Sequence, residues 1–253
     1  MLCPKPIAAL NDNYIWHLSK DNYSLVVDPG DAQAVLDKLG NQQLIAILIT
    51  HHHWDHTNGV NALKQKFPNA TVYGPKNCPF SHIDVELSEG MQIKIDTLNV
   101  CFNILHVPGH TLDHIAYYNH QFLFCGDTLF SIGCGRMFEG TPAIYVESLN
   151  KLKSLSKDLL VCCTHEYTQT NISFALSIQP DHQELLDLQN KVEQLRREKR
   201  PSLPVLLADE LKLNPFLRTD CAEMQKSVSN IIGTPVNTSI QTFAALRKLK
   251  DNF

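Results

Sequence analysis

The sequence contains no long apolar run, no secretion signal and no excess of one charge. None of its stretches reaches the roughly 18 consecutive apolar residues of a membrane-spanning helix. Its first residues lack the basic start, apolar run and small-residue cleavage site of a secretory signal. The formal net charge is −4 at pH 7, and no cluster of Lys and Arg provides a surface for nucleic acid. We therefore predict a cytoplasmic protein that binds neither membranes nor nucleic acid.

The sequence also lacks any CxxC pair, which disfavours a zinc site built from thiolates. Its eight Cys show no compact spacing, and a chain of 253 residues does not need disulfides to build a core. We expect reduced thiols. Cys162 and Cys163 lie in a predicted buried strand, where they would pack as small apolar residues. A catalytic Cys is an alternative for any thioester chemistry, although no Cys stands beside a His in a recognisable motif.

Short apolar runs alternate with helical patterns through the first two thirds of the chain. The strand predictions rest on Ile, Val, Leu and Phe content. They cover Tyr14–Leu18, Ser24–Asp28, Leu44–Thr50, Gln92–Ile95, Asn99–His106, Ile115–Tyr118, Phe122–Cys125 and Leu159–Thr164. Helices are predicted from a cap at Asp31 to Gly40, from about Asn58 to Phe67, and from Thr141-Pro142 onward.

After His165 the pattern becomes almost wholly helical. Apolar residues with helical spacing define three faces. They are Ile172, Ala175 and Leu176; Leu185, Leu188, Val192 and Leu195; and Ile240, Phe243, Leu246 and Leu249. We predict a mixed α/β domain over residues 1–167 and a small all-helical domain over residues 168–253.

The segment Leu44–Gly59, LIAILITHHHWDHTNG, carries the strongest chemical signal. Alternate residues of an extended chain point the same way, so His51 and His53 can approach one metal ion. The chain then turns into a helix, and Asp55 and His56 face a neighbouring point. Imidazole and carboxylate together suit zinc, iron or manganese. His52 is expected to point away from this pair, and a histidine-rich surface turn is the alternative without a metal.

Three more candidate ligands follow other predicted strands: His110 in PGHT, Asp127 in GDT, and His165. A single Asp after Gly is more often a turn residue than a ligand. Taken together, however, the strand ends supply five His and two Asp, enough for two metals that share one carboxylate. Asp28, Thr50 and Thr111 are candidates for orienting these ligands.

The ordered set HxHxDH, PGHT, GDT and THEYT resembles the metallo-β-lactamase superfamily, and within it the glyoxalase II family of hydroxyacylglutathione hydrolases. Further similar segments are NDNYIW, VDPGDA, GDTLFSIGCGRMFEG, HEYTQTNISFA, LNPFLR and RKLKDNF. The resemblance covers nearly the whole chain. It implies an α/β fold, a metallo-β-lactamase-like four-layer αββα sandwich, followed by the small C-terminal all-helical domain.

The resemblance also implies roles for individual residues. His51, His53 and His110 would bind the first metal; Asp55, His56 and His165 would bind the second; and Asp127 would bridge both. The cofactor would be two divalent ions per chain, with zinc expected and iron or manganese as alternatives. The two metals would hold a bridging hydroxide that attacks the substrate. Asp55 and Asp127 would be the catalytic carboxylates: Asp55 could also orient the hydroxide, and Asp127 would bridge the metals.

The substrate would be a glutathione thioester, S-D-lactoylglutathione, with glutathione and D-lactate as products and a monomer as the active form. Its glutathione moiety would contact Arg136, Phe138, Tyr167, Arg247 and Lys250. Arg247 and Lys250 share one helical face, which fits two donors on one carboxylate, although a solvated basic helix end has the same pattern. Many relatives have Lys and Tyr in place of Arg136 and Phe138, and Phe cannot donate a hydrogen bond.

Other activities of the superfamily remain open at this level. β-Lactamases carry an export signal and often a Cys in place of Asp127, and RNA-processing relatives need a basic surface. Persulfide oxidation at a single iron shares parts of the motifs, but the second set of ligands disfavours it. A metal-storing protein without catalysis is an alternative from another class. A structural metal site is closed by four protein ligands, whereas a carboxylate shared by two metals leaves room for water, which favours catalysis.

Overall fold

A computed structural model describes residues 2–253 and divides the chain into two compact units. Unit 1 comprises the residues up to Val107 together with Asp113–Gly126 and Cys162–His165. Unit 2 comprises Pro108–Leu112, Asp127–Val161 and Glu166–Phe253. Each unit therefore contains segments that lie far apart in the sequence, and each is described by itself.

The first sheet of unit 1 is mixed and has the strand order β1-β2-β3-β4-β5-β6. β1 pairs antiparallel with β2 and β2 with β3, while the pairs β3/β4, β4/β5 and β5/β6 are parallel. The strands are β1 (Lys5–Ala9), β2 (Asn13–Lys20), β3 (Tyr23–Val27), β4 (Gln43–Leu48), β5 (Thr71–Pro75) and β6 (Val85–Leu87).

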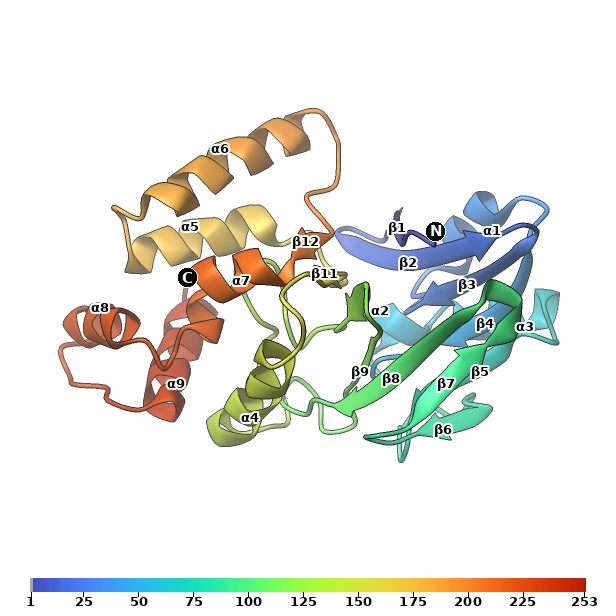
Figure 1. Cartoon of the computed structure of the whole chain (residues 1–253), viewed down its shortest axis with the longest axis horizontal. Helices are drawn as coiled ribbons and strands as arrows, with labels where there is room; N and C mark the ends of the chain where they lie inside the picture. The colour runs from blue at the N-terminus through green and yellow to red at the C-terminus, as the bar shows by residue number, and fades with distance from the viewer. Residues whose placement is uncertain (1) are drawn as a thin grey trace. The chain divides into compact units, whose positions relative to one another are not determined.

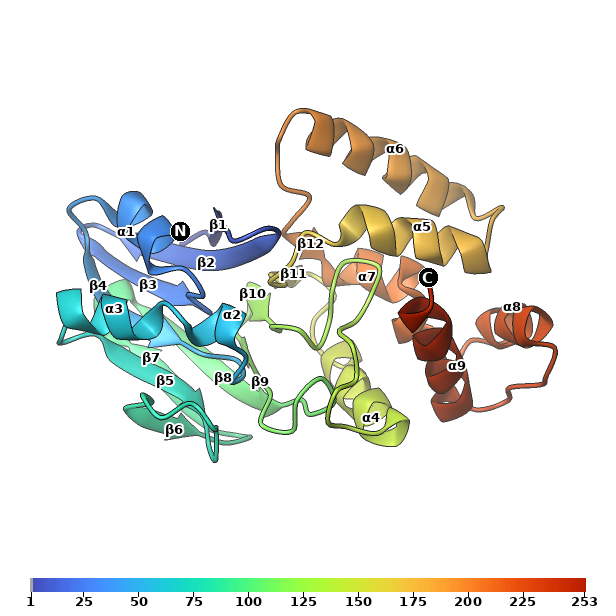
Figure 2. The ribbon, with the colours of Figure 1, turned by 180° about the vertical axis from the view of Figure 1, so that it is seen from behind.

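Helices α1 (Ala32–Leu39) and α3 (Val60–Lys66) lie on one face of this sheet, as Figure 2 shows. Their apolar residues, such as Val35 and Leu63, form one buried cluster with Ile15 and Val26 of the strands. The Asp31 carboxylate caps α1 by accepting from the backbone N–H groups of Gln33 and Ala34, as predicted. The helix ends at Gly40, whose φ of 55° favours glycine.

The second sheet contains β7 (Gln92–Ile95), β8 (Val100–His106), β9 (Ile115–Tyr118) and β10 (Phe122–Phe124), all antiparallel. The 3₁₀ turn η1 (Asp96–Leu98) joins β7 to β8. Trp16 of β2 contacts Phe124 of β10, with ring centroids 6.4 Å apart, and the Tyr117 hydroxyl donates to the Ile49 carbonyl. The first sheet is thus buried between helices and a second sheet, which explains its nearly continuous apolar strands.

Unit 2 is mostly helical, and Figure 1 shows α5 (Thr168–Ile178) and α6 (Gln183–Arg197) side by side. Its other elements are α4 (Pro142–Lys153), β11 (Leu160–Val161), β12 (Val205–Leu206), α7 (Leu207–Leu213), η2 (Pro215–Leu217), α8 (Ala222–Ile232) and α9 (Ser239–Asp251). Thr141 caps α4, and Pro142 is its first residue, as predicted. β12 adds a short strand to the region that was expected to be all-helical.

The apolar faces predicted for the C-terminal helices are largely confirmed. Ile172, Ala175, Leu185 and Val192 are buried in one cluster, with Leu176 and Leu188 partly buried against it. Phe243 and Leu246 of α9 are buried as well. Ile240 was predicted on the same face, but its side chain is 46% exposed. Ile240 lies in the first turn of α9, before the first buried residue of that helix, Thr242.

Several boundaries differ from the predictions. The helix predicted from about Asn58 to Phe67 is α3, and a separate short helix, α2 (Trp54–Thr57), precedes it. Gly59 lies between them against the Pro29 carbonyl, where a Cβ would lie 2.4 Å from the carbonyl oxygen. The strand expected over Leu159–Thr164 is regular only in β11. β1, β5, β6 and β12 were not predicted, since they are short or contain Gly and Pro, which weaken the strand signal.

Candidate metal centre

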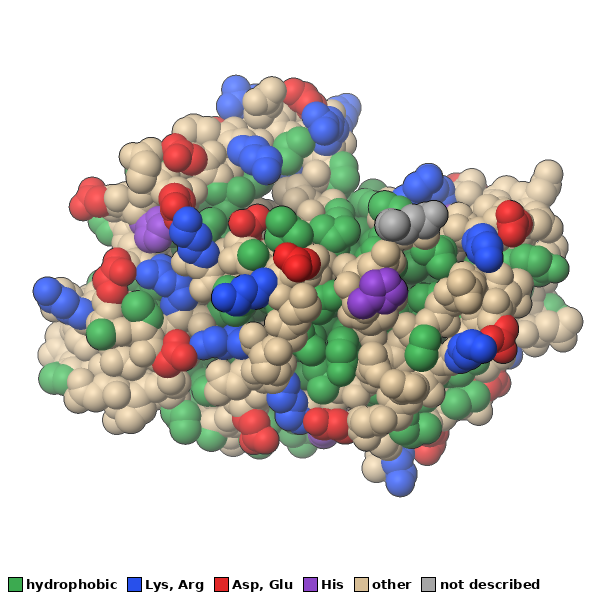
Figure 3. Space-filling model, viewed as in Figure 1, with side chains coloured by type: hydrophobic (Ala, Val, Ile, Leu, Met, Phe, Trp, Pro, Cys, Tyr) green, Lys and Arg blue, Asp and Glu red, His purple; other side chains and the backbone are tan. Residues whose placement is uncertain are grey.

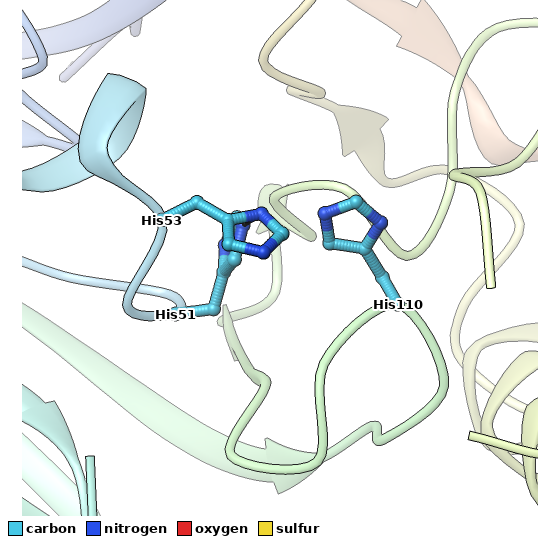
Figure 4. A group of neighbouring side chains, drawn as sticks. All are labelled: His51, His53 and His110. Carbon is cyan, nitrogen blue, oxygen red and sulfur yellow. Dashed lines mark hydrogen bonds between the residues drawn. The ribbon is translucent and has the colours of Figure 1, made fainter. Parts of the chain in front are cut away.

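The loop after β4 carries the histidine motif. His51 Nε2 and His53 Nδ1 lie 3.1 Å apart, so the two imidazoles approach each other as the strand alternation predicted. The His52 imidazole instead lies 2.9 Å from the Asp113 carboxylate, which confirms that it points away from the pair. Figure 4 draws His51 and His53 on this loop together with His110, the three residues predicted for the first metal.

Asp55, His56 and His165 form a cluster of possible metal ligands within unit 1. One ligand atom from each residue lies within 4.8 Å of the other two. The Asp55 carboxylate oxygen is 3.4 Å from His56 Nε2 and 3.5 Å from His165 Nε2. Two imidazoles and a carboxylate facing one point are the donor set that zinc, iron and manganese accept, so these residues fit a divalent cation.

The charge state of Asp55 is controlled by these neighbours. Burial of the carboxyl acts to raise its pKa, but hydrogen bonds with His165 and His56 and from Asn13 hold that pKa well below its usual value. The Asn13 amide donates to the carboxylate over 3.1 Å. Asp55 is therefore an anion at neutral pH, which is the form that binds a metal ion.

Carboxylates behind the imidazoles orient two of the histidines. Asp28 Oδ2 lies 3.1 Å from His56 Nδ1, and its carboxylate also accepts from the backbone N–H and hydroxyl of Thr50. His165 Nδ1 donates to Asp12 Oδ1 over 2.7 Å. In both residues the Nδ1 contact leaves Nε2 as the metal-facing nitrogen. The role predicted for Asp28 and Thr50 agrees with these contacts, whereas the hydroxyl of buried Thr111 has no partner among residues 2–253.

Sequence reasoning assigned no role to Asp12, Asn13 or His114. Asp12 and Asn13 belong to the quoted segment NDNYIW, but only the fold brings them to His165 and Asp55. His114 is completely buried and stacks on His51, with ring centroids 4.6 Å apart. Its Nδ1 donates to the Ile115 carbonyl. No spacing rule indicates such a histidine, because the stack joins two separate loops.

Within unit 2, His110 and Asp127 lie close together. His110 Nε2 lies 3.4 Å from Asp127 Oδ2, and His110 Nδ1 donates to the Arg136 carbonyl over 2.7 Å. Gly135 lies against both ligands, since a Cβ on it would be 2.0 Å from the Asp127 carbonyl oxygen and 3.1 Å from His110 Nδ1. Glycine is thus required in GCGR for a close approach of the backbone, and no larger residue fits there.

The residues predicted to hold glutathione all lie in unit 2 and differ in exposure. The Phe138 side chain is 59% exposed, and its ring is 5.2 Å from the His110 ring. The exposed Arg136 side chain has its Nε 3.6 Å from Asp251 Oδ1. The Tyr167 ring contacts Phe130 edge to face, at 5.3 Å. Arg136 and Phe138 are exposed and Tyr167 is half-buried, and contact of these three residues with glutathione stays a prediction.

The two basic residues of α9 have different surroundings. Arg247 is only 7% exposed, and its guanidinium donates to the Cys134 carbonyl over 3.0 Å and to Asp251. Lys250 Nζ donates to the Thr170 carbonyl over 3.3 Å and lies over the Phe174 and Phe253 rings. Burial, followed by the nearby Arg247 charge, lowers the Lys250 pKa to about 8.

The alternatives to a metal site receive little support. All eight cysteines are free thiols, as predicted, and Cys162 and Cys163 are buried. Burial raises the pKa of the Cys162 thiol well above its usual value, which disfavours the thiolate that covalent catalysis needs.

Among residues 2–253, no helix is long and apolar enough to cross a membrane. Figure 3 shows basic and acidic side chains interspersed on the drawn face.

Comparison with known proteins first shows the class of protein to which the chain belongs. Residues 12–165 match the family model of the metallo-β-lactamase superfamily. A crystal structure of ETHE1 from Myxococcus xanthus aligns with a TM-score of 0.65 at 22% identity, covering 98% of both chains. The BLEG-1 B3 metallo-β-lactamase aligns at 0.62 with 23% identity, covering 86% of this chain and 99% of that one. The protein therefore has the metallo-β-lactamase fold, as the sequence predicted, with a site for metal between histidines and aspartates.

The family follows from closer relatives. Residues 166–253 match the model of the hydroxyacylglutathione hydrolase C-terminus. The chain is 48% identical over 261 aligned residues to a hydroxyacylglutathione hydrolase of Pseudoalteromonas translucida (strain TAC 125), covering 100% of both. It is 46% identical over 250 residues to that of Aeromonas salmonicida (strain A449), covering 98% of both. The chain belongs to the hydroxyacylglutathione hydrolase family.

Proposed function

We propose that the protein hydrolyses S-(2-hydroxyacyl)glutathione, with S-D-lactoylglutathione as its substrate and glutathione and D-lactate as products. This reaction would be the second step of methylglyoxal detoxification. The observation that carries the proposal is identity of 44–48% over at least 95% of each relative's length to proteins that bear the name hydroxyacylglutathione hydrolase. The cluster of Asp55, His56 and His165, in which Asp55 is ionised, supports it, because a metal bound there could activate the water that thioester hydrolysis needs.

Two divalent cations are proposed as the cofactor, with zinc as the expected metal. His51, His53 and His110 would hold one, Asp55, His56 and His165 the other, and Asp127 both. Bound metals of this kind supply Lewis acidity and lower the pKa of a water molecule toward neutrality. The proposed ligand set is supported by the histidine and aspartate pairs that lie together within each unit.

The protein's own residues would orient the reacting groups. Asn13 holds one oxygen of Asp55 through its amide, so the carboxylate is positioned to accept a hydrogen bond from the attacking water. Asp12 and Asp28 keep the His165 and His56 rings turned toward the same point. The departing glutathione thiolate is stable near neutral pH, because thiols are much stronger acids than alcohols. The reaction therefore needs no dedicated general acid.

The glutathione moiety would lie on residues 168–253, the predicted C-terminal domain, and on the GCGR segment. Arg136, Phe138 and Tyr167 offer a cation, an apolar ring and a phenol. Lys250 adds a second cation, and Arg247 is the fifth predicted contact. We further propose that the enzyme acts as a monomer in the cytoplasm, where glutathione is abundant and thiols stay reduced.

The test is hydrolysis of S-D-lactoylglutathione by the wild type and by Asp127→Ala, each assayed for bound metal. We expect fast release of glutathione by the wild type, at least about a hundredfold less in the variant, and a loss of bound metal. Glutathione persulfide with oxygen uptake serves as the second substrate. A metal-loaded wild type that leaves the thioester intact would contradict the proposal, and oxygen uptake would then assign persulfide oxidation.

A further inference from the structure

Glu166, the residue between His165 and Tyr167, has a buried carboxylate that accepts from three donors. Its side chain is only 7% exposed. Oε2 accepts from the Ser202 backbone N–H over 2.8 Å and from Arg196 Nη1 over 3.3 Å, and Oε1 accepts from the Ser202 hydroxyl. A buried carboxylate is costly unless it is paired, and these donors pair it. Ser202 and Arg196 are therefore held against the segment HEYT.

Ser202 contacts the residues on both sides of Tyr167. Besides its two bonds to Glu166, its Oγ lies 2.7 Å from Thr168 Oγ1 at the start of α5. Ser202 belongs to the connection between α6 and β12 (Figure 1), and it lies 34 positions from Thr168 in the sequence. Tyr167 directly precedes α5, and its carbonyl accepts from the Asn171 backbone N–H over 2.9 Å. The main chain around Tyr167 is thus held by contacts on both sides.

The Tyr167 ring packs on an aromatic residue whose position is also fixed within unit 2. It contacts the Phe130 ring edge to face, with centroids 5.3 Å apart. The Phe130 carbonyl accepts from the amide of buried Asn214 over 3.1 Å, and the same amide donates to the Gly133 carbonyl over 2.9 Å. The contacts of Ser202 fix the main chain of Tyr167 and Phe130 fixes its ring, so the phenol has one preferred direction.

We propose that Ser202 is a positioning residue for substrate: by holding Glu166 and Thr168, it keeps the Tyr167 phenol in the direction in which it donates a hydrogen bond to a glutathione thioester. The inference rests on the proposed function, which makes Tyr167 a contact of glutathione. A side chain that is ordered before binding loses less conformational entropy when the substrate arrives. Ser202 should therefore affect the affinity for substrate and not the retention of metal.

Ser202→Ala tests the proposal, because it removes the hydroxyl that contacts Glu166 and Thr168 and keeps the backbone N–H. We expect KM for S-D-lactoylglutathione to rise about 3- to 10-fold, with kcat changed less than about twofold and bound metal unchanged. Ser202→Thr restores a hydroxyl and should bring KM back close to the wild-type value. Ser173→Ala is the matched control and should alter none of these quantities, because it removes an exposed hydroxyl that donates within α5 to the Gln169 carbonyl.

A measurement without substrate separates this inference from the proposed function. In protein labelled with 3-fluorotyrosine, the ¹⁹F signal of Tyr167, assigned by its absence in Tyr167→Phe, reports the contact with Phe130. We expect Ser202→Ala to move this signal toward its position in the unfolded protein, and Ser202→Thr and Ser173→Ala to leave it in place.

The outcomes are distinguishable. If the wild type leaves the thioester intact while Ser202→Ala moves the Tyr167 signal, the proposed substrate is wrong and Ser202 still positions Tyr167. With an active wild type, an unchanged KM or an unmoved Tyr167 signal in Ser202→Ala would overturn the proposal. Loss of metal in Ser202→Ala would also overturn it, because the effect of Ser202 would then lie at His165.

Discussion

A single acceptor beside the ring determines which nitrogen His56, His165 and His110 each offer to a metal. Asp28 contacts His56, Asp12 contacts His165, and in unit 2 a main-chain carbonyl takes the same place at His110. Each acceptor favours a proton on Nδ1 and leaves Nε2 for the metal, so the tautomer is fixed in the metal-free protein. This arrangement explains why short histidine motifs require acidic residues from distant parts of the chain.

Replacement of Asp12 should show that metal binding depends on the orientation of the His165 ring. In Asp12→Ala the His165 Nδ1 proton loses its acceptor, and the ring is free to rotate or to change tautomer. We expect kcat/KM for the thioester, and affinity for the metal, to fall about 10- to 100-fold. Asp37→Ala, at an exposed position of α1, is the matched control and should behave as the wild type. Equal activity and metal content in both variants would show that Asp12 has no orienting role.

Among the helices, α7 supports the segment between Asp127 and the GCGR loop from within unit 2. Glu210 Oε2 accepts from the backbone N–H of Ile132 over 2.8 Å and from the Asn214 amide over 2.9 Å. Ile132 has a φ of 56°, a conformation that costs energy for a β-branched residue. Burial raises the pKa of Glu210 to about 7, although hydrogen bonds from Asn214 and Ile132 oppose the rise.

This buried carboxyl predicts a pH dependence of stability. Because its pKa is higher in the folded than in the unfolded state, folding takes up a proton between about pH 4.5 and 7. The free energy of unfolding should therefore fall as pH rises through this range and level off above it. Glu210→Gln cannot ionise, so its unfolding free energy relative to wild type should rise over this range by up to about 3 kcal/mol. Urea titrations from pH 5 to 8 measure this change, with Asp181→Asn at an exposed position as control. A difference in unfolding free energy that is independent of pH would refute the prediction.

At the scale of the whole molecule, the residues proposed as ligands are distributed over the two units. His51, His53, Asp55, His56 and His165 belong to unit 1, and His110 and Asp127 belong to unit 2. A metal bound to the folded chain would stabilise it, since it binds the unfolded chain only weakly.

Removal of the metal should therefore lower stability as well as activity. After chelation and dialysis we expect loss of thioesterase activity and a fall in Tm of several degrees, with recovery of both when zinc is added. The binding relation gives about 2.7 kcal/mol of stabilisation at a metal concentration 100 times the Kd. Calorimetry with increasing zinc measures the shift. A Tm that does not respond to metal would mean that the ions, if bound, do not stabilise the fold.

Much of this protein was predictable from local patterns. The capped helix after Asp31, the start of α4 at Thr141-Pro142, and the buried strand that ends before His51 all depend on neighbouring residues. The approach of His51 to His53 and the separate direction of His52 follow from alternation along the chain. The family resemblance extended these predictions to a full set of ligands.

Other features were decided only by the tertiary structure. The contact of Asp12 with His165 joins residues 153 positions apart, and Arg247 reaches Cys134 over 113 positions. The periodicity of a sequence does not predict such pairs, because they depend on how separate elements pack. By itself the sequence determined the mixed α/β pattern, the helix caps and the residue types that bind a metal, since these are properties of local conformation and chemistry. The particular fold was predicted from the family resemblance. Only the folded chain decided which carboxylate or carbonyl orients each histidine, and that Ser202 contacts both neighbours of Tyr167.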